Sequence, residues 1–161
     1  AVMELGATVC TPRDPACGHC PLAARCIARK QDLIGLLPVK AKKAAPRLRH
    51  FNYLVIEEKG GLLFTQRGSG DIWQGLNELP LMETRSAARP SAFKKKFPSA
   101  TATRIAGPMD HVLSHQRIRA VLWKVTDIGH RFPSTWKPVK RSAIRRLPTH
   151  RLMEKLLDLL D

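Results

Sequence analysis

From Phe51 onward the apolar residues follow strand-type patterns. The runs FNYLVIEE (51–58) and LLFTQR (62–67) are separated by the turn residues Lys-Gly-Gly (59–61), and together they predict a β-hairpin. A second strand pair is predicted over residues 111–114 and 117–125, where apolar and polar positions alternate in the second run.

Helical and irregular segments lie around these strands. The pattern predicts a short helix over residues 86–97 that begins at Ser86 and is disturbed by Pro90, and an irregular segment over 71–81 that Trp73 anchors in the core. A closing helix is predicted from Thr149, with an apolar stripe of Leu152, Leu156, Leu159 and Leu160. Strands, a helix, more strands and a final helix predict an α+β fold with a mixed or antiparallel sheet.

The first fifty residues have a different character. Residues 1–9 fit the last turns of a helix without a capping residue, so we expect the chain to be the later part of a longer protein. A short helical stretch after Cys26 is predicted to run through Leu33 and to end at Gly35. Residues 36–50 contain prolines and several Lys or Arg but no acid, and they predict a basic interdomain linker.

The charge balance indicates which class of partner the chain binds. The chain has 161 residues, 28 Lys and Arg against 13 Asp and Glu, and a net charge of +15, which favours a polyanion as partner. The segment between Asp127 and Glu154 contains no acid. No apolar run approaches the length of a membrane span, and no predicted helix combines a basic face with exposed aromatic residues, so a membrane partner is the poorer interpretation.

Four cysteines, and no others, lie within the first 26 residues. Cys10, Cys17, Cys20 and Cys26 have the spacing C-x6-C-x2-C-x5-C. The basic composition and the lack of an apolar leader argue against a secreted disulfide framework, so the spacing favours metal ligation. On spacing alone, structural zinc and a [4Fe-4S] cluster remain equally open. His19 lies between two of the ligands and is interpreted as a solvated loop residue.

The residues around the cysteines distinguish between zinc and a [4Fe-4S] cluster. The stretch AVMELGATVCTPRDPACGHCPLAARCIA resembles the loop that follows the helix-hairpin-helix domain in endonuclease III and in MutY-type adenine DNA glycosylases. The resemblance implies a [4Fe-4S] cluster on the four cysteines, with residues 1–35 as the end of that glycosylase domain and its cluster loop. Basic residues near the loop and in the linker are then expected to contact DNA phosphates. These residues are Arg13, Arg25, Arg29, Lys30, Lys40, Lys42 and Lys43.

Residues 51–161 resemble the MutT/Nudix-like C-terminal domain of the same MutY family, and GDIWQGLNELPL corresponds to its Trp-x-Gly-Leu segment. Nudix hydrolases carry the signature Arg-Glu-x-x-Glu-Glu on a helix to hold divalent ions. Here the only adjacent acids are Glu57 and Glu58, on a predicted strand, and the helix bears Lys94 to Lys96 instead. The sequence therefore argues against a metal-dependent pyrophosphatase and favours a recognition domain.

The resemblance also implies a lesion reader. The MutY family carries a Phe-Ser-His motif whose serine reads 8-oxoguanine, and the matching residues here are Leu113, Ser114 and His115. Oxidation gives guanine an N7–H donor and a C8 carbonyl acceptor, which a serine hydroxyl and its backbone N–H can satisfy. Leu113 replaces the aromatic residue of the motif, so its expected role as a wedge against the base stack is the weakest of the three.

Taken together, the resemblance implies the C-terminal part of an adenine DNA glycosylase of base excision repair. In that family the catalytic acids precede the cluster loop, so we expect no catalytic residue in this chain and no activity of the chain alone. The expected partners are duplex DNA with adenine opposite 8-oxoguanine or guanine, and an N-terminal catalytic domain that this sequence does not include. We expect a monomer in the bacterial cytoplasm, associated with the nucleoid through DNA. The alternative is a stand-alone iron–sulfur module for DNA binding or redox sensing.

Overall fold

A computed structural model describes residues 1–39, 45–129 and 132–160. The chain divides into two compact units, Ala1–Ala44 and Ala45–Asp161, which are described separately. The first unit consists of short helical pieces without a fully buried side chain. Its elements are α1 (Val2–Thr8), the 3-10 turns η1 (Cys17–His19) and η2 (Ala23–Arg25), α2 (Ile27–Lys30) and η3 (Ile34–Leu36).

The described residues of the second unit form two sheets and three short helices. The strands are β1 (Arg47–Val55), β2 (Glu57–Glu58), β3 (Gly61–Gln66), β4 (Asn77–Glu78), β5 (Leu81–Thr84), β6 (Thr101–Val112), β7 (Gln116–Thr126) and β8 (Lys137–Lys140). The helices are α3 (Ser91–Lys94), α4 (Arg141–Ile144) and α5 (Arg151–Leu157).

The larger sheet is mixed and has the strand order β5-β1-β7-β6. Strands β1 and β7 are parallel, while β5 and β6 pair antiparallel at its edges. Because β1 lies in the middle and is covered on both faces, its sequence is a nearly continuous apolar run. The predicted α+β fold with a mixed sheet is confirmed.

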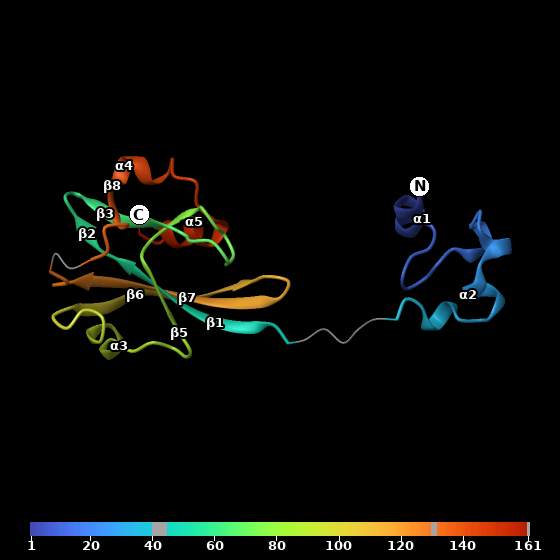
Figure 1. Ribbon diagram of the computed structural model, residues 1–161, viewed down its shortest axis with the longest axis horizontal. Helices are drawn as coiled ribbons and strands as arrows, with labels where there is room; N and C mark the ends of the chain where they lie inside the picture. The colour runs from blue at the N-terminus through green and yellow to red at the C-terminus, as the bar shows by residue number, and fades with distance from the viewer. Residues whose placement is uncertain (40–44, 130–131, 161) are drawn as a thin grey trace. The chain divides into compact units, whose positions relative to one another are not determined.

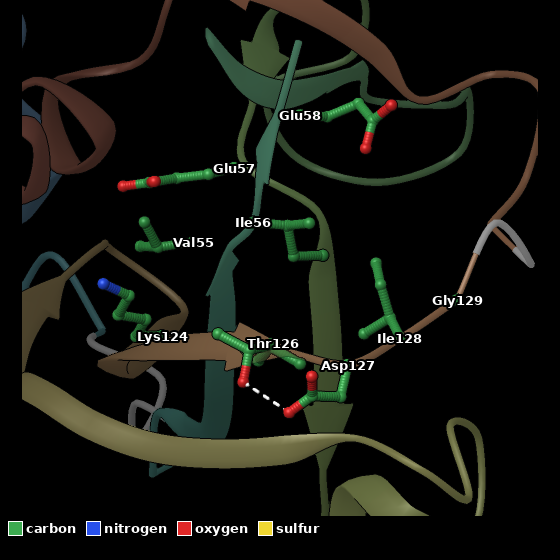
Figure 2. Close-up of a pocket in the computed structure, with 10 residues that line it drawn as sticks. Val55, Ile56, Glu57, Glu58, Lys124, Thr126, Asp127, Ile128 and Gly129 are labelled. Carbon is green, nitrogen blue, oxygen red and sulfur yellow. Dashed lines mark hydrogen bonds between the residues drawn. The ribbon is translucent and has the colours of Figure 1, made fainter. Parts of the chain in front are cut away.

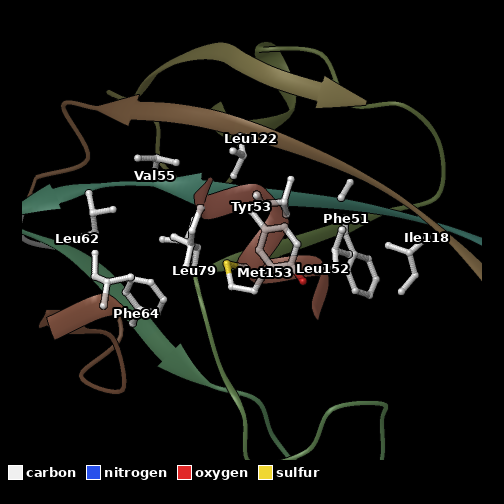
Figure 3. Close-up of a cluster of buried hydrophobic side chains, with 14 residues drawn as sticks. Phe51, Tyr53, Val55, Leu62, Phe64, Leu79, Ile118, Leu122, Leu152 and Met153 are labelled. Atoms are coloured by element: carbon white, nitrogen blue, oxygen red, sulfur yellow. The ribbon is translucent and has the colours of Figure 1, made fainter. Parts of the chain in front are cut away.

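Two hydrophobic cores flank this sheet. Phe51 and Tyr53 of β1 face Phe64 of β3 and Leu152 of α5 in the main core, as Figure 3 shows. On the other face, Leu54 packs in a second core with Phe93, Trp123 and Trp136. Helices α4 and α5 lie on one side of the sheet and α3 lies on the other (Figure 1).

The predicted hairpin forms only between β2 and β3, in the second sheet. Glu57 pairs with Leu62, and Lys59 and Gly60 turn the chain with φ angles of 49° and 75°. Such positive angles at both central positions are typical of a tight hairpin turn, for which glycine is suited. Strand β1 leaves this hairpin at Ile56 and belongs to the mixed sheet instead.

The expected start of the first strand at residue 51 is wrong by four residues. β1 begins at Arg47, within the predicted linker of residues 36–50. Parallel pairing with β7 extends the strand, because Arg47 lies opposite Gln116 and Arg49 opposite Ile118. Arg49 is also buried by acidic partners that are distant in sequence. The three linker lysines that were expected to contact DNA, Lys40, Lys42 and Lys43, lie outside the described residues.

Two other boundaries also differ from the predictions. The helix predicted over 86–97 is reduced to α3, because a residue preceding proline avoids helical geometry and the helix can start only at Pro90. Strand β6 begins at Thr101 and not at His111, since register shifts between Arg104 and Met109 break its alternation. Gly107, with φ of 91°, allows this irregularity because a Cβ there would approach Ala120 O to 2.7 Å.

The closing helix is shorter than predicted. α5 begins at Arg151, where the His150 side chain accepts a hydrogen bond from Met153 N and caps the helix. The helix ends at Leu157, so Leu159 and Leu160 lie beyond it, and Leu159 is 51% exposed. The buried residues that replace them in the stripe are Met153 and Leu157, which the prediction missed.

Candidate functional site

All four cysteines of the first unit line one small concavity, together with Val9, Pro15, Ala23 and Arg29. None of the four forms a disulfide. Among the described residues, no group of three or more His, Cys, Asp or Glu side chains is arranged to hold a single metal ion. The four thiols therefore share one concavity without a disulfide among them.

Short backbone turns bring the thiols to this concavity. Cys10 N donates to Leu5 O at 2.7 Å at the end of α1, and η1 places Cys17 and Cys20 one turn apart. Arg29 lines the same concavity and donates from Nη1 to Cys17 O at 3.4 Å. This contact gives Arg29 a role within the loop that its sequence position did not suggest.

The other basic residues expected to contact DNA near the loop, Arg13, Arg25 and Lys30, have exposed side chains. Among the described residues none of the three makes an ion pair or a side-chain hydrogen bond. They therefore remain accessible cations around the concavity, and their contact with phosphate stays a prediction.

In the second unit, Ser114 and His115 form the tip of the β6–β7 hairpin. Leu113 N donates to Gln116 O at 2.8 Å, which closes a tight connection between the strands. Both tip side chains are exposed, and Ser114 Oγ lies 3.2 Å from His115 Nδ1. The structure thus presents two of the three predicted reader residues to solvent.

Leu113 is oriented differently. Its side chain is partly buried and packs against the main core. An apolar residue packed in this way stabilises the base of the hairpin, so the expected wedge role has no support from its position. The neighbouring Val112 is 68% exposed and is the more accessible apolar side chain at this end of β6.

A partly buried ionic network contacts the base of the hairpin at Gln116. Arg49 donates to Glu83 at 2.8 and 2.6 Å, to Asp71 at 2.7 Å twice, and to Gln116 Oε1 at 3.2 Å. These bonds use all five N–H donors of the guanidinium. They hold the pKa of Asp71 and that of Glu83 below the usual carboxyl range, chiefly through hydrogen bonding to Arg49.

Asp71 joins this network to a second one. It accepts a hydrogen bond of 2.6 Å from Arg67 Nη2, and Arg67 also donates to Glu78 at 2.8 Å. Glu78 accepts from the Tyr53 hydroxyl at 3.1 Å in the main core, and burial together with the Glu78 charge raises the pKa of Tyr53. The sequence prediction missed this network, although Arg67 and Asp71 are only four residues apart, because Glu78 and Tyr53 are brought to it by the fold.

The irregular segment 67–76 is fixed by the same groups. Arg67 Nε donates to Ile72 O at 2.8 Å, and Trp73 has a φ angle of 61°. The Trp73 ring stacks on His150 at 3.8 Å between centroids and 9° between planes. Trp73 is partly buried against the main core, as the sequence predicted, and His150 is the partner that the sequence did not indicate.

A concavity of about 510 Å³ lies beside the hairpin tip. It is lined by Arg47, Arg49, Gly70, Asp71, Ile72, Gln74, His115 and Gln116. Among the described residues the Arg47 side chain makes no ion pair or hydrogen bond, while its backbone N donates to His115 O at 3.3 Å. The concavity therefore brings His115 and Gln116 together with two arginines and the Asp71 carboxylate at the edge of the reader.

Comparison with known proteins gives a family match for each of the two units. Residues 10–26 match the iron-sulfur binding domain of endonuclease III, and residues 52–159 match the NUDIX domain. The chain belongs to the Nudix domain family. The cysteine loop that precedes the Nudix domain binds a [4Fe-4S] cluster, which Cys10, Cys17, Cys20 and Cys26 would hold.

Relatives found by sequence similarity have the name adenine DNA glycosylase. The enzyme of Buchnera aphidicola subsp. Schizaphis graminum is 31% identical over 84 residues, which cover 52% of this chain and 24% of the relative. The rat enzyme is 58% identical over 31 residues, which cover 19% of this chain and 6% of the relative. The chain thus spans about a quarter or less of the length of these relatives, and it corresponds to the C-terminal part of a MutY-type protein.

A solved structure has the same fold as the Nudix unit. The C-terminal domain of mouse MUTYH, in a crystal structure of its complex with human PCNA, matches with a TM-score of 0.53 and 12% identity. The match covers 70% of this chain and 86% of that chain. At this identity the likeness shows the fold.

A second concavity of about 300 Å³ in the Nudix domain contains the only adjacent acids of the chain. Figure 2 shows that Glu57, Glu58 and Asp127 point in different directions around it. Glu57 pairs with Arg141 at 3.1 Å, and Asp127 accepts a hydrogen bond from Thr126 at 3.0 Å. These carboxylates do not converge, which agrees with the sequence argument against a metal-dependent pyrophosphatase.

Across the described residues, no helix has the length and apolar character needed to cross a bilayer.

Proposed function

We propose that this chain is the C-terminal part of an adenine DNA glycosylase that removes adenine opposite 8-oxoguanine or guanine in base excision repair. The observation that carries the proposal is the order of parts in one chain: a four-cysteine cluster loop followed by a Nudix domain without a converging acid cluster in its described residues. Relatives with the name adenine DNA glycosylase support it.

In this proposal the Nudix domain recognises the base opposite the adenine. Ser114 and His115 are exposed at a hairpin tip next to Gln116, which accepts a hydrogen bond from buried Arg49, and this support suits a side chain that must approach a base edge. Ser114 reads the oxidised edge of 8-oxoguanine, where an N7–H donor and a C8 carbonyl replace the guanine pattern. A good base-edge contact contributes about 1–3 kcal/mol of discrimination.

The rest of the affinity comes from phosphate contacts. The net charge of +15 and the exposed Arg13, Arg25 and Lys30 supply salt-dependent attraction to duplex DNA. Arg47, at the edge of the concavity beside His115, is a further cation suited to a phosphate near the lesion. The protein is proposed to act as a monomer on DNA in the bacterial cytoplasm.

The cluster-loaded chain should bind a duplex with adenine opposite 8-oxoguanine more tightly than the same duplex with adenine opposite guanine. Fluorescence anisotropy at fixed salt measures both affinities, and Ser114→Ala should remove most of the difference. Lys95→Ala, an exposed change away from the hairpin, is the control. Equal affinity of the unaltered chain for the two duplexes would contradict the proposed recognition.

The catalytic acids of the family precede the cluster loop, so the chain alone should release no adenine from either duplex. An assay that detects free adenine tests this expectation, and release by the 161-residue chain would refute it. The coding sequence upstream of Ala1 separates the proposal from a stand-alone iron–sulfur module. A helix-hairpin-helix domain with a catalytic aspartate there supports the glycosylase, and its absence supports the module.

A further inference from the structure

We propose that Arg49 and Gln116 act as positioning residues that orient the Ser114 hydroxyl, through His115, as a hydrogen-bond donor. The inference rests on the proposed function, in which Ser114 reads 8-oxoguanine, and it specifies which atom of the lesion the hydroxyl reads. It follows from a continuous series of contacts that runs from the buried ionic network to the hairpin tip.

The first contact fixes the orientation of the Gln116 amide. Arg49 Nη1 lies 3.2 Å from Gln116 Oε1, and both residues are buried, at 8% and 5% exposure. A guanidinium has donors only, so the carbonyl oxygen of the amide must face it. The reversed amide would place an NH₂ group against the arginine in a buried site, which leaves two donors without an acceptor.

The second contact fixes the tautomer of His115. With its oxygen on Arg49, the Gln116 amide directs Nε2 toward His115 Nε2 at 3.4 Å. The NH₂ group can only donate, so the imidazole nitrogen that faces it must be the acceptor. A neutral imidazole with an unprotonated Nε2 carries its proton on Nδ1.

The third contact sets the direction of the serine hydroxyl. His115 Nδ1 lies 3.2 Å from Ser114 Oγ, and its N–H donates to that oxygen. The hydroxyl proton of Ser114 is then free to donate outward, because the imidazole offers it no acceptor. Two backbone hydrogen bonds, Arg47 N to His115 O and Leu113 N to Gln116 O, keep the tip in place for this arrangement.

The hydroxyl proton can favour 8-oxoguanine at one position only, while the second lone pair of the oxygen stays available to N7–H. At N7 a donor would favour guanine, whose N7 is an acceptor, over 8-oxoguanine, whose N7 carries a proton. At C8 the donor meets the carbonyl oxygen of 8-oxoguanine but only a C–H of guanine. The arrangement therefore directs the Ser114 hydroxyl to the C8 oxygen of the lesion.

The tautomer of His115 is measurable without DNA. Two-bond ¹H–¹⁵N correlation spectra of the cluster-loaded chain at neutral pH distinguish the two neutral forms, and comparison with His115→Gln assigns the signals. We expect the Nδ1–H form. A dominant Nε2–H form would overturn the proposal whatever the DNA-binding results.

The role of Gln116 is tested by Gln116→Met, which keeps the length of the side chain but removes both amide groups. We expect its His115 signals to shift toward a mixture of tautomers. We also expect at least about a fivefold loss in the affinity ratio of 8-oxoguanine over guanine duplexes, the lower end of the effect of one base-edge contact. Gln74→Met makes the same change at an exposed position of the same concavity and should leave both readouts unaltered.

A lesion analogue tests the atom that is read. In a duplex with 8-thioguanine opposite adenine, N7 keeps its proton, but sulfur replaces the C8 oxygen as a weaker acceptor. The unaltered chain should lose most of its preference for this base, and full retention would overturn the reading of the C8 oxygen. Should the chain show no preference for 8-oxoguanine at all, the proposed function fails. A preference that survives Gln116→Met refutes only the positioning role.

Discussion

The carboxylate of Asp71 accepts two parallel hydrogen bonds from the guanidinium of Arg49, each 2.7 Å long. The same carboxylate accepts from Arg67, so one acid of an irregular loop holds two buried arginines. Burial of a guanidinium is costly unless its charge is compensated. Asp71 is therefore expected to be a principal stabilising residue of the Nudix domain.

Replacing Asp71 by asparagine should lower the free energy of unfolding of the Nudix domain. The amide can accept only part of the hydrogen bonds and carries no charge for Arg49 and Arg67. Because the Asp71 side chain is 36% exposed, solvent screening reduces the loss to about 1–2 kcal/mol. Urea denaturation followed by tryptophan fluorescence measures it, since all three tryptophans lie in this domain. Asp127→Asn, whose carboxylate accepts from neighbouring Thr126, is the matched control.

The contact between Arg49 and Asp71 also makes the free energy of unfolding depend on pH. Arg49 keeps the pKa of Asp71 and that of Glu83 below the usual range, whereas unfolded carboxyls bind protons near pH 4. The unfolded state therefore binds more protons in that region, and the free energy of unfolding increases with pH. We expect stability to be retained above about pH 5 and to decline as the pH falls toward 3. A pH series of urea midpoints should show a shallower decline for Asp71→Asn, and an identical slope would contradict this origin.

The cluster assignment can be tested by measuring the iron and sulfide content of the protein. Cys20→Ser should prevent cluster assembly, because a serine hydroxyl is a poor substitute for a thiolate ligand. Iron and acid-labile sulfide per chain, together with the brown absorbance of the purified protein, should fall well below the values of the unaltered chain. His19→Ala, at the adjacent exposed position, should leave all three unaltered. Stoichiometric zinc in a colourless unaltered protein would contradict the cluster assignment.

Local patterns were sufficient to predict part of this structure. The gathering of the four cysteines around one concavity agrees with their close spacing, and the turn at Lys59 and Gly60 follows from residue type, because both features depend only on neighbours in the sequence. The central strand was found because it is covered on both faces and so is apolar almost throughout.

The ionic support of the hairpin could not be predicted in this way. Arg49 lies in a basic stretch that suggests a solvated linker, and its acidic partners are 22 and 34 residues away. Only the parallel pairing of β1 with β7 brings Arg49 to Gln116. One local signal was available: Arg47 and Arg49 continue the period-two alternation of Phe51 toward the N-terminus.

The partners of a buried polar residue within a strand are equally hard to predict from local sequence. Asn52 interrupts the apolar run of β1, yet it is 2% exposed. It donates to Met82 O and to Thr84, and it accepts from Trp123 Nε1, at 3.0 Å each. Each of these partners comes from a neighbouring strand, so the satisfaction of the amide depends on sheet order and not on local sequence.

A substitution of Leu113 distinguishes a role in packing the hairpin against the core from a role in contacting DNA. Because its side chain packs partly against the main core, Leu113→Ala should lower the free energy of unfolding by about 1–2 kcal/mol, less than the loss for a fully buried leucine. Under conditions where the variant remains folded, its affinity ratio for 8-oxoguanine over guanine duplexes should be unaltered. Val112→Ala removes apolar atoms at the adjacent position, which is 68% exposed, and should change stability little. Weakened lesion preference with unaltered urea stability would instead indicate that Leu113 contacts the DNA.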